Sequence, residues 1–395
     1  MKYLIFPVDK SSVSFCYYEN PHAASDPEPI PKETVQRAAE FARANGYTIN
    51  FVYGPTEPPR QYRSLIESVG HAKIVPLALA KKYPEGVIVI ESGEIERTVN
   101  CGLDRGRNVI VRIPREDLPR LASILPRLFG AFQRLNVCIV GLESIVDKEL
   151  ELYGQQLQEV VETVASLYRQ GHIFELNIVT DRMMLDTMKN CDAGCEHLTV
   201  GPDGRLYLCP GFLYDDPAAS VGNLTDGIHI PNAQLLCLDH SPICSRCDAY
   251  HCMRCTYLNK KLTLEVNTPS RQQCVASHKE RGASEKLLGL LQDVPAFSGM
   301  KKIHAIDYND PFVLLQRSRN EPFTDGDINH DSTVIAGGHP NREANDPRTQ
   351  FHSQTGTNSV EKVEPGDQPT RDILIEMHNM LKEILGLLRK EHIRP

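Results

Sequence analysis

Apolar and amphipathic stretches alternate along the first half of the chain. Strand-length apolar runs at residues 3–8 and 47–53 flank an amphipathic stretch at 32–44, where hydrophobic positions recur every three or four residues. Strands separated by helices in this way are typical of mostly parallel sheets, with the connecting helices packed outside. The pattern therefore predicts an α/β fold, built either as an open sheet or as a partial barrel.

The same alternation is expected to continue to about residue 184. The pattern predicts further strands at residues 73–77, 87–91, 109–113, 137–141 and 174–179, and helices at 118–134 and 147–169. Between residues 71 and 113 the sequence is rich in strands and poor in helices, so the repeat is irregular there.

Beyond residue 184, cysteines, prolines and turn residues replace the helical periodicity. Residues 197–208 predict a β-hairpin whose turn lies at 201–204. Such a hairpin would place Cys195 and Cys209 at its two open ends. One further short helix is predicted at residues 285–291.

These changes divide the chain into four predicted segments. We expect an α/β domain at residues 1–184, a small cysteine-rich domain at 185–294, a polar flexible linker at 295–369 and an amphipathic helix at 370–395. Apolar positions in the last segment follow the spacing of a coiled-coil seam. That helix either joins copies of the chain into a homo-oligomer or docks on its own domain.

Composition narrows the classes of partner. The 395 residues carry a net charge of −8, so the chain has no basic field to neutralise phosphates and a nucleic-acid partner is not expected. No apolar run approaches the ~20 residues that cross a bilayer, and the N-terminal apolar run is too short for a signal peptide. We therefore expect a cytoplasmic protein without a membrane partner. Twelve cysteines in a reducing compartment indicate metal or redox chemistry rather than disulfides.

Eight of the cysteines follow a regular spacing. The pattern is Cys191-x3-Cys195, Gly204-x4-Cys209, Cys244-x2-Cys247-x4-Cys252-x2-Cys255 and finally Cys274. Thiolates are soft ligands for zinc and for iron–sulfur clusters, and eight of them divide into two four-coordinate sites. The loop between the two Cys-x2-Cys pairs is much shorter than in a zinc ribbon, which favours iron–sulfur and leaves a pair of zinc ions as the alternative. His251 and Cys237 lie outside the pattern and are expected to be bystanders.

The order of these motifs resembles the SPASM module, the twin iron–sulfur domain of peptide-modifying radical-SAM enzymes. The stretch after the hairpin, with Cys209-Pro210-Gly211 and Val221-Gly222-Asn223-Leu224, is also similar to that module. The resemblance implies two [4Fe–4S] clusters with interleaved ligands: Cys191, Cys195, Cys209 and Cys255 for one, and Cys244, Cys247, Cys252 and Cys274 for the other. The middle cysteine run is one residue shorter than the usual pattern at each of two gaps, which leaves the division of ligands between the sites open.

The N-terminal loop departs from radical-SAM enzymes. Their Cys-x3-Cys-x2-Cys triad corresponds here to Asp9, Val13 and Cys16, so only the last cysteine is present and SAM cleavage is not expected. A degenerate radical-SAM-like partial (β/α) barrel followed by a SPASM-type domain resembles the CXXX-repeat peptide maturase family over residues 1–294. Cys16, with Cys101 and Cys138, is expected to be a packed or partly exposed free thiol.

Two functions of different classes follow from the resemblance. The first is maturation of a cysteine-rich, ribosomally synthesised precursor peptide, with the auxiliary clusters moving electrons or holding a substrate thiolate and a reductase as electron donor. The second is a non-catalytic, metal-stabilised peptide-binding scaffold that serves a partner modifying enzyme. A zinc-stabilised regulator is a weaker third hypothesis, because the chain lacks a basic helix that could recognise nucleic acid. No catalytic residue is assigned.

Overall fold

A computed structural model describes residues 1–188 and 191–303 of the chain, and these residues form one compact unit. The predicted helix at 370–395 and all but the first residues of the predicted linker lie outside the described residues.

A nine-stranded sheet forms the centre of the described part. Its strands are Tyr3–Pro7 (β1), Thr48–Val52 (β2), His71–Pro76 (β3), Val87–Glu91 (β4), Asn108–Pro114 (β5), Arg134–Val140 (β6), Glu175–Leu176 (β7), His197–Val200 (β8) and Leu206–Tyr207 (β9). They are ordered β7-β6-β5-β4-β3-β2-β1-β8-β9, and neighbouring strands run parallel except β8 and β9. Because β7 and β9 remain edges, the sheet is not closed. The predicted α/β fold with a radical-SAM-like partial barrel is confirmed.

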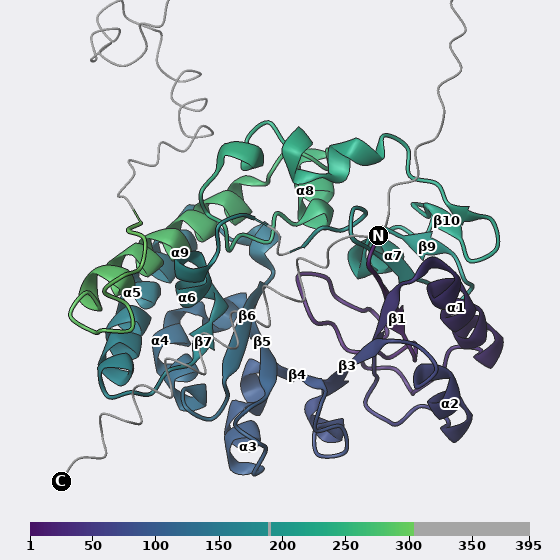
Figure 1. The fold of residues 1–395 in the computed structure, drawn as a ribbon, viewed down its shortest axis with the longest axis horizontal. Coiled ribbons are helices and arrows are strands. Elements are labelled where there is room, and N and C mark those ends of the chain that lie inside the picture. Colours follow the sequence, from purple (N-terminus) through teal and green to yellow (C-terminus); the bar gives the residue numbers. More distant parts are fainter. Residues whose placement is uncertain (189–190, 304–395) are drawn as a thin grey trace, which may run out of the picture. The chain divides into compact units, whose positions relative to one another are not determined.

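Helices pack around this sheet. They are Lys32–Asn45 (α1), Arg63–Ile66 (α2), Ile95–Asn100 (α3), Leu121–Ile124 (α4), Asp147–Arg169 (α5), Asn177–Met184 (α6), Pro210–Asp215 (α7), Thr256–Thr263 (α8) and Arg271–Leu290 (α9). Figure 1 shows α1 and α2 beside β1–β3, and α4, α5, α6 and α9 at the end of the sheet that holds β5–β7. A small antiparallel pair, Gly222–Asn223 (β10) and Gly227–Ile228 (β11), follows α7.

The core lies between the strands and the buried faces of the helices. Alternate residues of the central strands, including Leu4, Phe6 and Phe51, are fully buried. The buried positions of α5 recur every three or four residues, as in Leu157 and Val161, so the predicted amphipathic helix at 147–169 is confirmed.

Three predicted elements differ from the structure. The helix predicted at 118–134 is broken into a 3₁₀ helix Arg115–Arg120, the single turn α4 and a second 3₁₀ helix, Leu125–Leu128. Pro119 and Pro126 explain the breaks, because proline lacks the N–H that a continuous helix needs.

The strand predicted at 174–179 ends after Leu176 and turns into α6. The Asn177 side chain accepts from the N–H of Val137 over 2.8 Å and donates to its carbonyl over 3.0 Å. This amide takes the bonding positions on β6 that a longer strand would use, so the backbone of α6 is free to form a helix.

The short helix predicted at 285–291 is the end of the 20-residue helix α9. Its buried face includes Gln273, Ser277 and Ser284, which are polar or small, so no apolar period marked its first half. Cys274 therefore lies in the first turn of a helix, not in a loop.

The predicted hairpin is confirmed, since β8 and β9 pair antiparallel around a turn in which Gly204 has φ of +82°. The same hairpin extends the main sheet, because β8 also pairs in parallel with β1. The sheet thus continues past the expected domain boundary at residues 184/185, and that boundary stays a prediction.

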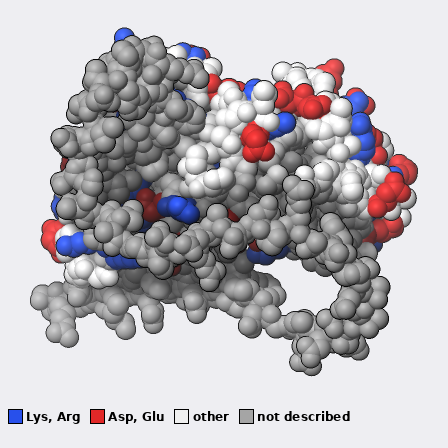
Figure 2. Space-filling view, turned by 90° about the horizontal axis from the view of Figure 1, so that it is seen from above, with Lys and Arg blue, Asp and Glu red and all other residues white. Residues whose placement is uncertain are grey.

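The described surface carries charges of both signs. On the face in Figure 2, acidic and basic side chains are interspersed over the described residues. Within the described ranges, no helix has the length and apolarity that a bilayer crossing requires.

Candidate metal centre

The cysteine-bearing segments meet through the packing of two short helices. Helices α7 and α8 each begin directly after a buried cysteine, Cys209 and Cys255 respectively. The Phe212 ring of α7 packs edge-on against the Tyr257 ring of α8, with centroids 5.9 Å apart. This contact brings together two thiols that are 46 positions apart in the sequence.

A buried arginine joins the segment before β8 to the segment before α8. Arg254, which precedes Cys255, is 4 % exposed, and its Nη2 lies 3.5 Å from Asp192 Oδ1. Asp192 directly follows Cys191. The ion pair therefore holds Cys191 and Cys255 on neighbouring segments.

The loop after β1 brings a fourth cysteine to the same region. The Tyr18 ring stacks on the Tyr214 ring of α7 with centroids 5.6 Å apart. Cys16, two residues before Tyr18, packs against the same core cluster as Cys209 and Cys255. We call Cys16, Cys191, Cys209 and Cys255 the first thiol group.

Burial and mutual repulsion suppress ionisation in the first thiol group. Burial raises the pKa of the Cys255 thiol well above its usual range, and the charges of Cys191, Cys209 and Cys16 raise it further. Burial also raises the pKa of Cys16 to about 12, with Cys191 adding to the effect and the cation of Arg112 opposing it. Thiols so placed stay neutral until a positive centre stabilises their anions, which is what a bound metal does.

A second thiol group contains Cys244, Cys247 and Cys252. These three residues pack with Met188 and Ala249 in a cluster separate from the main core. Backbone N–H groups point at two of the sulfurs, since Ala249 donates to Cys247 Sγ and Arg254 donates to Cys252 Sγ, each over 3.4 Å. Such tight turns around a sulfur are compatible with thiolate ligands.

The second thiol group is anchored to α9. Both Oδ atoms of Asp248 accept from the Arg281 guanidinium, over 2.8 and 2.7 Å, and Oδ2 also accepts from Arg182 over 3.0 Å. These bonds, led by that from Arg281, hold the pKa of Asp248 down at about 2. His278 on α9 places Nε2 3.6 Å from Cys247 Sγ, and burial lowers the pKa of this histidine to about 4.

Cys274, the predicted fourth ligand of the second set, lies one helical turn before His278 on α9. Its helix is thus fixed to the Cys244–Cys252 segment through Asp248 and Arg281. The role of Cys274 as a metal ligand stays a prediction.

Cys195 differs from the other predicted ligands. Its sulfur forms a disulfide with Cys237, which was expected to be a bystander. The expectation that the cysteines avoid disulfides is therefore wrong for this pair. A disulfide sulfur is not a thiolate, so Cys195 can serve as a ligand only in the reduced protein, where its predicted role remains a prediction.

The donor chemistry of the two groups fits a thiolate-bound metal, but the predicted first set does not fit as a whole. Three of its four members, Cys191, Cys209 and Cys255, lie together, whereas Cys195 is bonded elsewhere. Over residues 1–188 and 191–303, no three His, Cys, Asp or Glu side chains already stand in positions that would hold a metal ion. Metal binding therefore requires the sulfurs of each thiol group to move closer together around the metal.

The loop that carries the radical-SAM triad in other enzymes is held here by hydrogen bonds within the loop and to the segment after β2. Asp9 is buried, and its Oδ1 accepts from the backbone N–H and the hydroxyl of Ser11 over 2.8 and 2.5 Å. The Val13 N–H donates to the Tyr53 carbonyl over 3.0 Å. Of the three triad positions, only Cys16 offers a sulfur.

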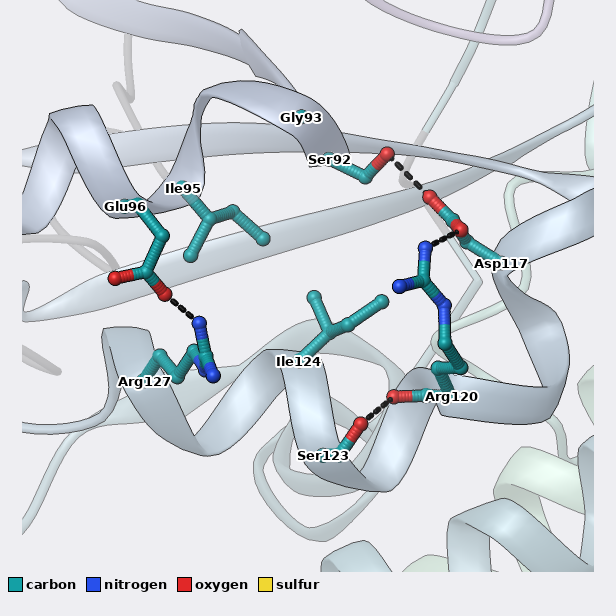
Figure 3. Close-up of a pocket in the computed structure, with 9 residues that line it drawn as sticks. All are labelled: Ser92, Gly93, Ile95, Glu96, Asp117, Arg120, Ser123, Ile124 and Arg127. Carbon is teal, nitrogen blue, oxygen red and sulfur yellow. Dashed lines mark hydrogen bonds and ion pairs between the residues drawn. The ribbon is translucent and has the colours of Figure 1, made fainter.

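A surface pocket of about 270 Å³ lies away from these sulfurs. Figure 3 shows its charged lining paired internally: Arg120 with Asp117, and Arg127 with Glu96. The Ser92 hydroxyl also donates to Asp117 over 2.5 Å. With its charges neutralised and no cysteine in its lining, this pocket gives no indication of a site.

Comparison with known proteins supports the fold. No protein-family model matches the chain, and no curated protein matches it. A solved structure of the anaerobic sulfatase-maturating enzyme anSMEcpe with bound AdoMet is similar at a TM-score of 0.51 and 14% identity, covering 74% of this chain and 100% of that one. The same enzyme with bound AdoMet and Cp18Cys peptide matches at 0.50 and 15%, covering 74% and 99%.

The chain therefore has a radical-SAM-like partial-barrel fold. The fold agrees with the coarse resemblance, and the iron–sulfur module inferred from the cysteine spacing stays a proposal. The narrower resemblance to CXXX-repeat peptide maturases stays a prediction.

Sequence reasoning missed several residues around the sulfurs. The sequence predicts a packed or partly exposed free thiol at Cys16, and it does not single out Arg112 or Arg254. The aromatic residues after Cys16 were the available signal, because Tyr18 is the one that docks the loop on α7. Nothing in the local sequence of either arginine predicts its burial.

Proposed function

We propose that this protein takes part in the maturation of a cysteine-rich, ribosomally synthesised peptide, through a SPASM-type domain that binds two auxiliary [4Fe–4S] clusters and without reductive cleavage of SAM. The observation that carries the proposal is the interleaving of the thiols. Cys255 packs in the main core with Cys209, and Cys191 packs against that core, whereas Cys252, only three residues before Cys255, packs in a separate cluster with Cys244 and Cys247. Interleaving of this kind is what the SPASM resemblance implies for the two ligand sets.

Buried cations beside the sulfurs support anionic centres. Arg254 lowers the pKa of Cys191 and of Cys244, and so acts on both groups, although burial raises both values overall. Arg112 acts in the same direction on Cys16. Iron–sulfur clusters held by four thiolates carry negative charge, and nearby cations and N–H donors tune their reduction potentials.

A peptide partner is supported by the similar solved structures. One of them binds a peptide together with AdoMet, and the fold of this chain matches nearly all of that protein. The chain retains Cys16 but has Asp9 and Val13 at the other triad positions, so the AdoMet of that relative is not carried over to our proposal. Electrons would then come from a reductase or a partner enzyme.

The alternative function is a non-catalytic peptide-binding scaffold. It is favoured by the N-terminal loop, which is fixed by hydrogen bonds and lacks the three cysteines that form an open iron site. In that case the metals, either two clusters or two zinc ions, stiffen the docking domain and a partner enzyme performs the chemistry. Both functions require the protein to bind a peptide. They differ in whether the protein itself modifies that peptide.

Metal analysis tests the clusters first. The full chain, purified without oxygen, should contain iron and sulfide and should show the broad visible absorption of [4Fe–4S] proteins. Cys247→Ser should lose iron from the second group, whereas Cys101→Ser, a cysteine that donates to the Thr98 carbonyl over 3.0 Å, should not. Zinc without iron would refute the redox function.

Peptide chemistry then separates enzyme from scaffold. The iron-loaded protein is incubated with a peptide of repeated cysteines and a reductant, and peptide masses are measured. A mass change that depends on Cys247 supports a maturase. An unchanged mass with measurable peptide binding supports the scaffold, and the absence of binding contradicts both.

A further inference from the structure

The Cys195–Cys237 disulfide leaves the first predicted metal set one sulfur short. Cys191, Cys209 and Cys255 remain grouped, while the sulfur of Cys195 is bonded outside the group. A four-coordinate thiolate centre needs one further donor from the surrounding residues. The nearest elements are the segment before β8, the starts of α7 and α8, and the loop after β1.

The loop after β1 presents Cys16 to this group. Stacking of Tyr18 on Tyr214 docks the loop on α7, whose first residue follows Cys209. On its other side the Tyr18 carbonyl accepts from the Arg112 guanidinium over 3.4 Å. Arg112 is itself held by Glu91 over 2.8 Å and by Glu19, so the loop is fixed from two directions.

The backbone after Cys16 faces its sulfur, as it does at several predicted ligands. The N–H groups of Tyr18 and Tyr17 act to lower the pKa of Cys16, as those of Phe212 and Gly211 do for Cys209. Ala193 acts in this way on Cys191 and Leu258 on Cys255, while Ala249 and Arg254 donate to Cys247 Sγ and Cys252 Sγ over 3.4 Å. Donation of this kind stabilises a thiolate acceptor.

Other cysteines outside the spacing pattern behave differently. The Cys101 thiol is itself a donor, to the carbonyl three residues before it. Cys138 lies within strand β6, where its backbone is committed to the sheet. The Cys16 sulfur thus faces backbone N–H groups, as the predicted ligands do, whereas the Cys101 thiol donates to a carbonyl.

We propose that Cys16, and not Cys195, supplies the fourth sulfur of the first metal centre, together with Cys191, Cys209 and Cys255. This inference rests on the proposed function only in requiring a metal at the first thiol group. The Cys195–Cys237 bond then has a separate role, which is to tie the entrance of the hairpin to the segment around Leu236. The loop after β1, which carries the cysteine triad in radical-SAM enzymes, then supplies a ligand to the first metal centre.

Three variants of the full chain test the assignment: Cys16→Ala, the double variant Cys195→Ala with Cys237→Ala, and Cys101→Ala as the matched control. Each is purified without oxygen and reconstituted with iron and sulfide, and iron per chain is measured. We expect Cys16→Ala to lose roughly half of the bound iron, because one of two four-iron centres loses a ligand. The double variant and the control should keep the wild-type content.

A second measurement separates ligand loss from misfolding. Cys16→Ser keeps a donor oxygen and changes the size of the side chain little, so it should retain the fold by circular dichroism and alter the electron paramagnetic resonance of the reduced protein. An unaltered spectrum with full iron overturns the assignment.

The outcomes also distinguish this inference from the proposed function. If Cys16→Ala keeps its iron and the double variant loses half, Cys195 is the ligand and the proposed function stands. If the wild-type chain binds zinc instead, loss of one of two zinc ions in Cys16→Ala supports the assignment although the redox function fails. A wild-type chain that binds neither metal overturns both.

Discussion

The buried guanidinium of Arg254 donates to the backbone carbonyl of Leu236 over 2.8 Å. The same Nη2 lies 3.5 Å from Asp192, so one side chain connects the segments that carry Cys191, Cys237 and Cys255. Arg254 holds a positive φ of 44°, which is uncommon for a residue other than glycine. Its backbone N–H is the one that donates to Cys252.

We predict that Arg254→Lys weakens this junction. Lysine keeps the charge, but its side chain is shorter and its ammonium does not reach the position of Nη2, which contacts both acceptors, so a buried acceptor loses its partner. The free energy of unfolding should fall by about 1–3 kcal/mol, measured by urea denaturation. Arg246→Lys, at an exposed position in the same region, is the control and should change it by less than about 0.5 kcal/mol.

The Cys195–Cys237 bond should be detectable chemically. Alkylation of the denatured protein before and after reduction should show two additional reactive cysteines after reduction, and peptide mapping should assign them to positions 195 and 237. The bond closes a loop of 42 residues, for which chain entropy gives a stabilisation of up to about 4 kcal/mol. Cys237→Ser should therefore lower the unfolding free energy under oxidising conditions and change it little in reductant. Equal stability of variant and wild type without reductant would contradict the bond.

Asp248 should be the residue that fixes the second thiol group to α9. Asp248→Asn keeps the size of the side chain but removes the charge that pairs with Arg281, whose guanidinium is 3 % exposed. Because Asp248 is partly exposed and Arg281 keeps its pair with Glu285, we expect a loss of about 1–3 kcal/mol, less than for a fully buried pair. The variant should also retain less iron at the second thiol group. Asp203→Asn, which breaks an exposed pair with Arg205, should alter neither quantity.

The sequence predicted those parts of the fold that a short-range pattern encodes. The strand at Val87–Glu91 and the helix at Asp147–Arg169 were predicted at their observed bounds, because apolar residues follow the strand or helix pattern along the whole of each element. Helix α9 was found only at its end, since Gln273 and Ser277 bury polar groups against specific partners. Burial of these polar side chains depends on tertiary contacts, which the spacing of apolar residues in the sequence does not reveal.

The candidate site divides in the same way between local pattern and long-range contact. Cysteine spacing predicted that eight thiols would form metal sites, and the SPASM resemblance implied which thiols belong to each set. Those ligand sets stay a prediction, although Cys191, Cys209 and Cys255 lie in one region of the structure. The position of Cys16 could not be derived this way, because it depends on a loop docking on α7 across about 200 residues of sequence, a long-range contact of the kind that spacing does not encode. The pairing of Cys195 with Cys237 is likewise a contact in space between two turns.

Packing of α7 against α8 should control the relative position of Cys209 and Cys255. A Cβ added at Gly211 would lie 2.5 Å from the Tyr257 ring, which cannot move without displacing Phe212. Gly211→Ala should therefore cost about 1–3 kcal/mol through overpacking. Gly282→Ala is the matched control, because its added Cβ meets nothing within 4 Å and lies inside helix α9, where alanine is favoured over glycine by about 1 kcal/mol. Thermal denaturation of the two variants should thus shift in opposite directions. If the first metal centre depends on this helix contact, Gly211→Ala also loses iron while Gly282→Ala retains it, and equal iron in both variants would show that the two sulfurs are positioned independently of α7 and α8.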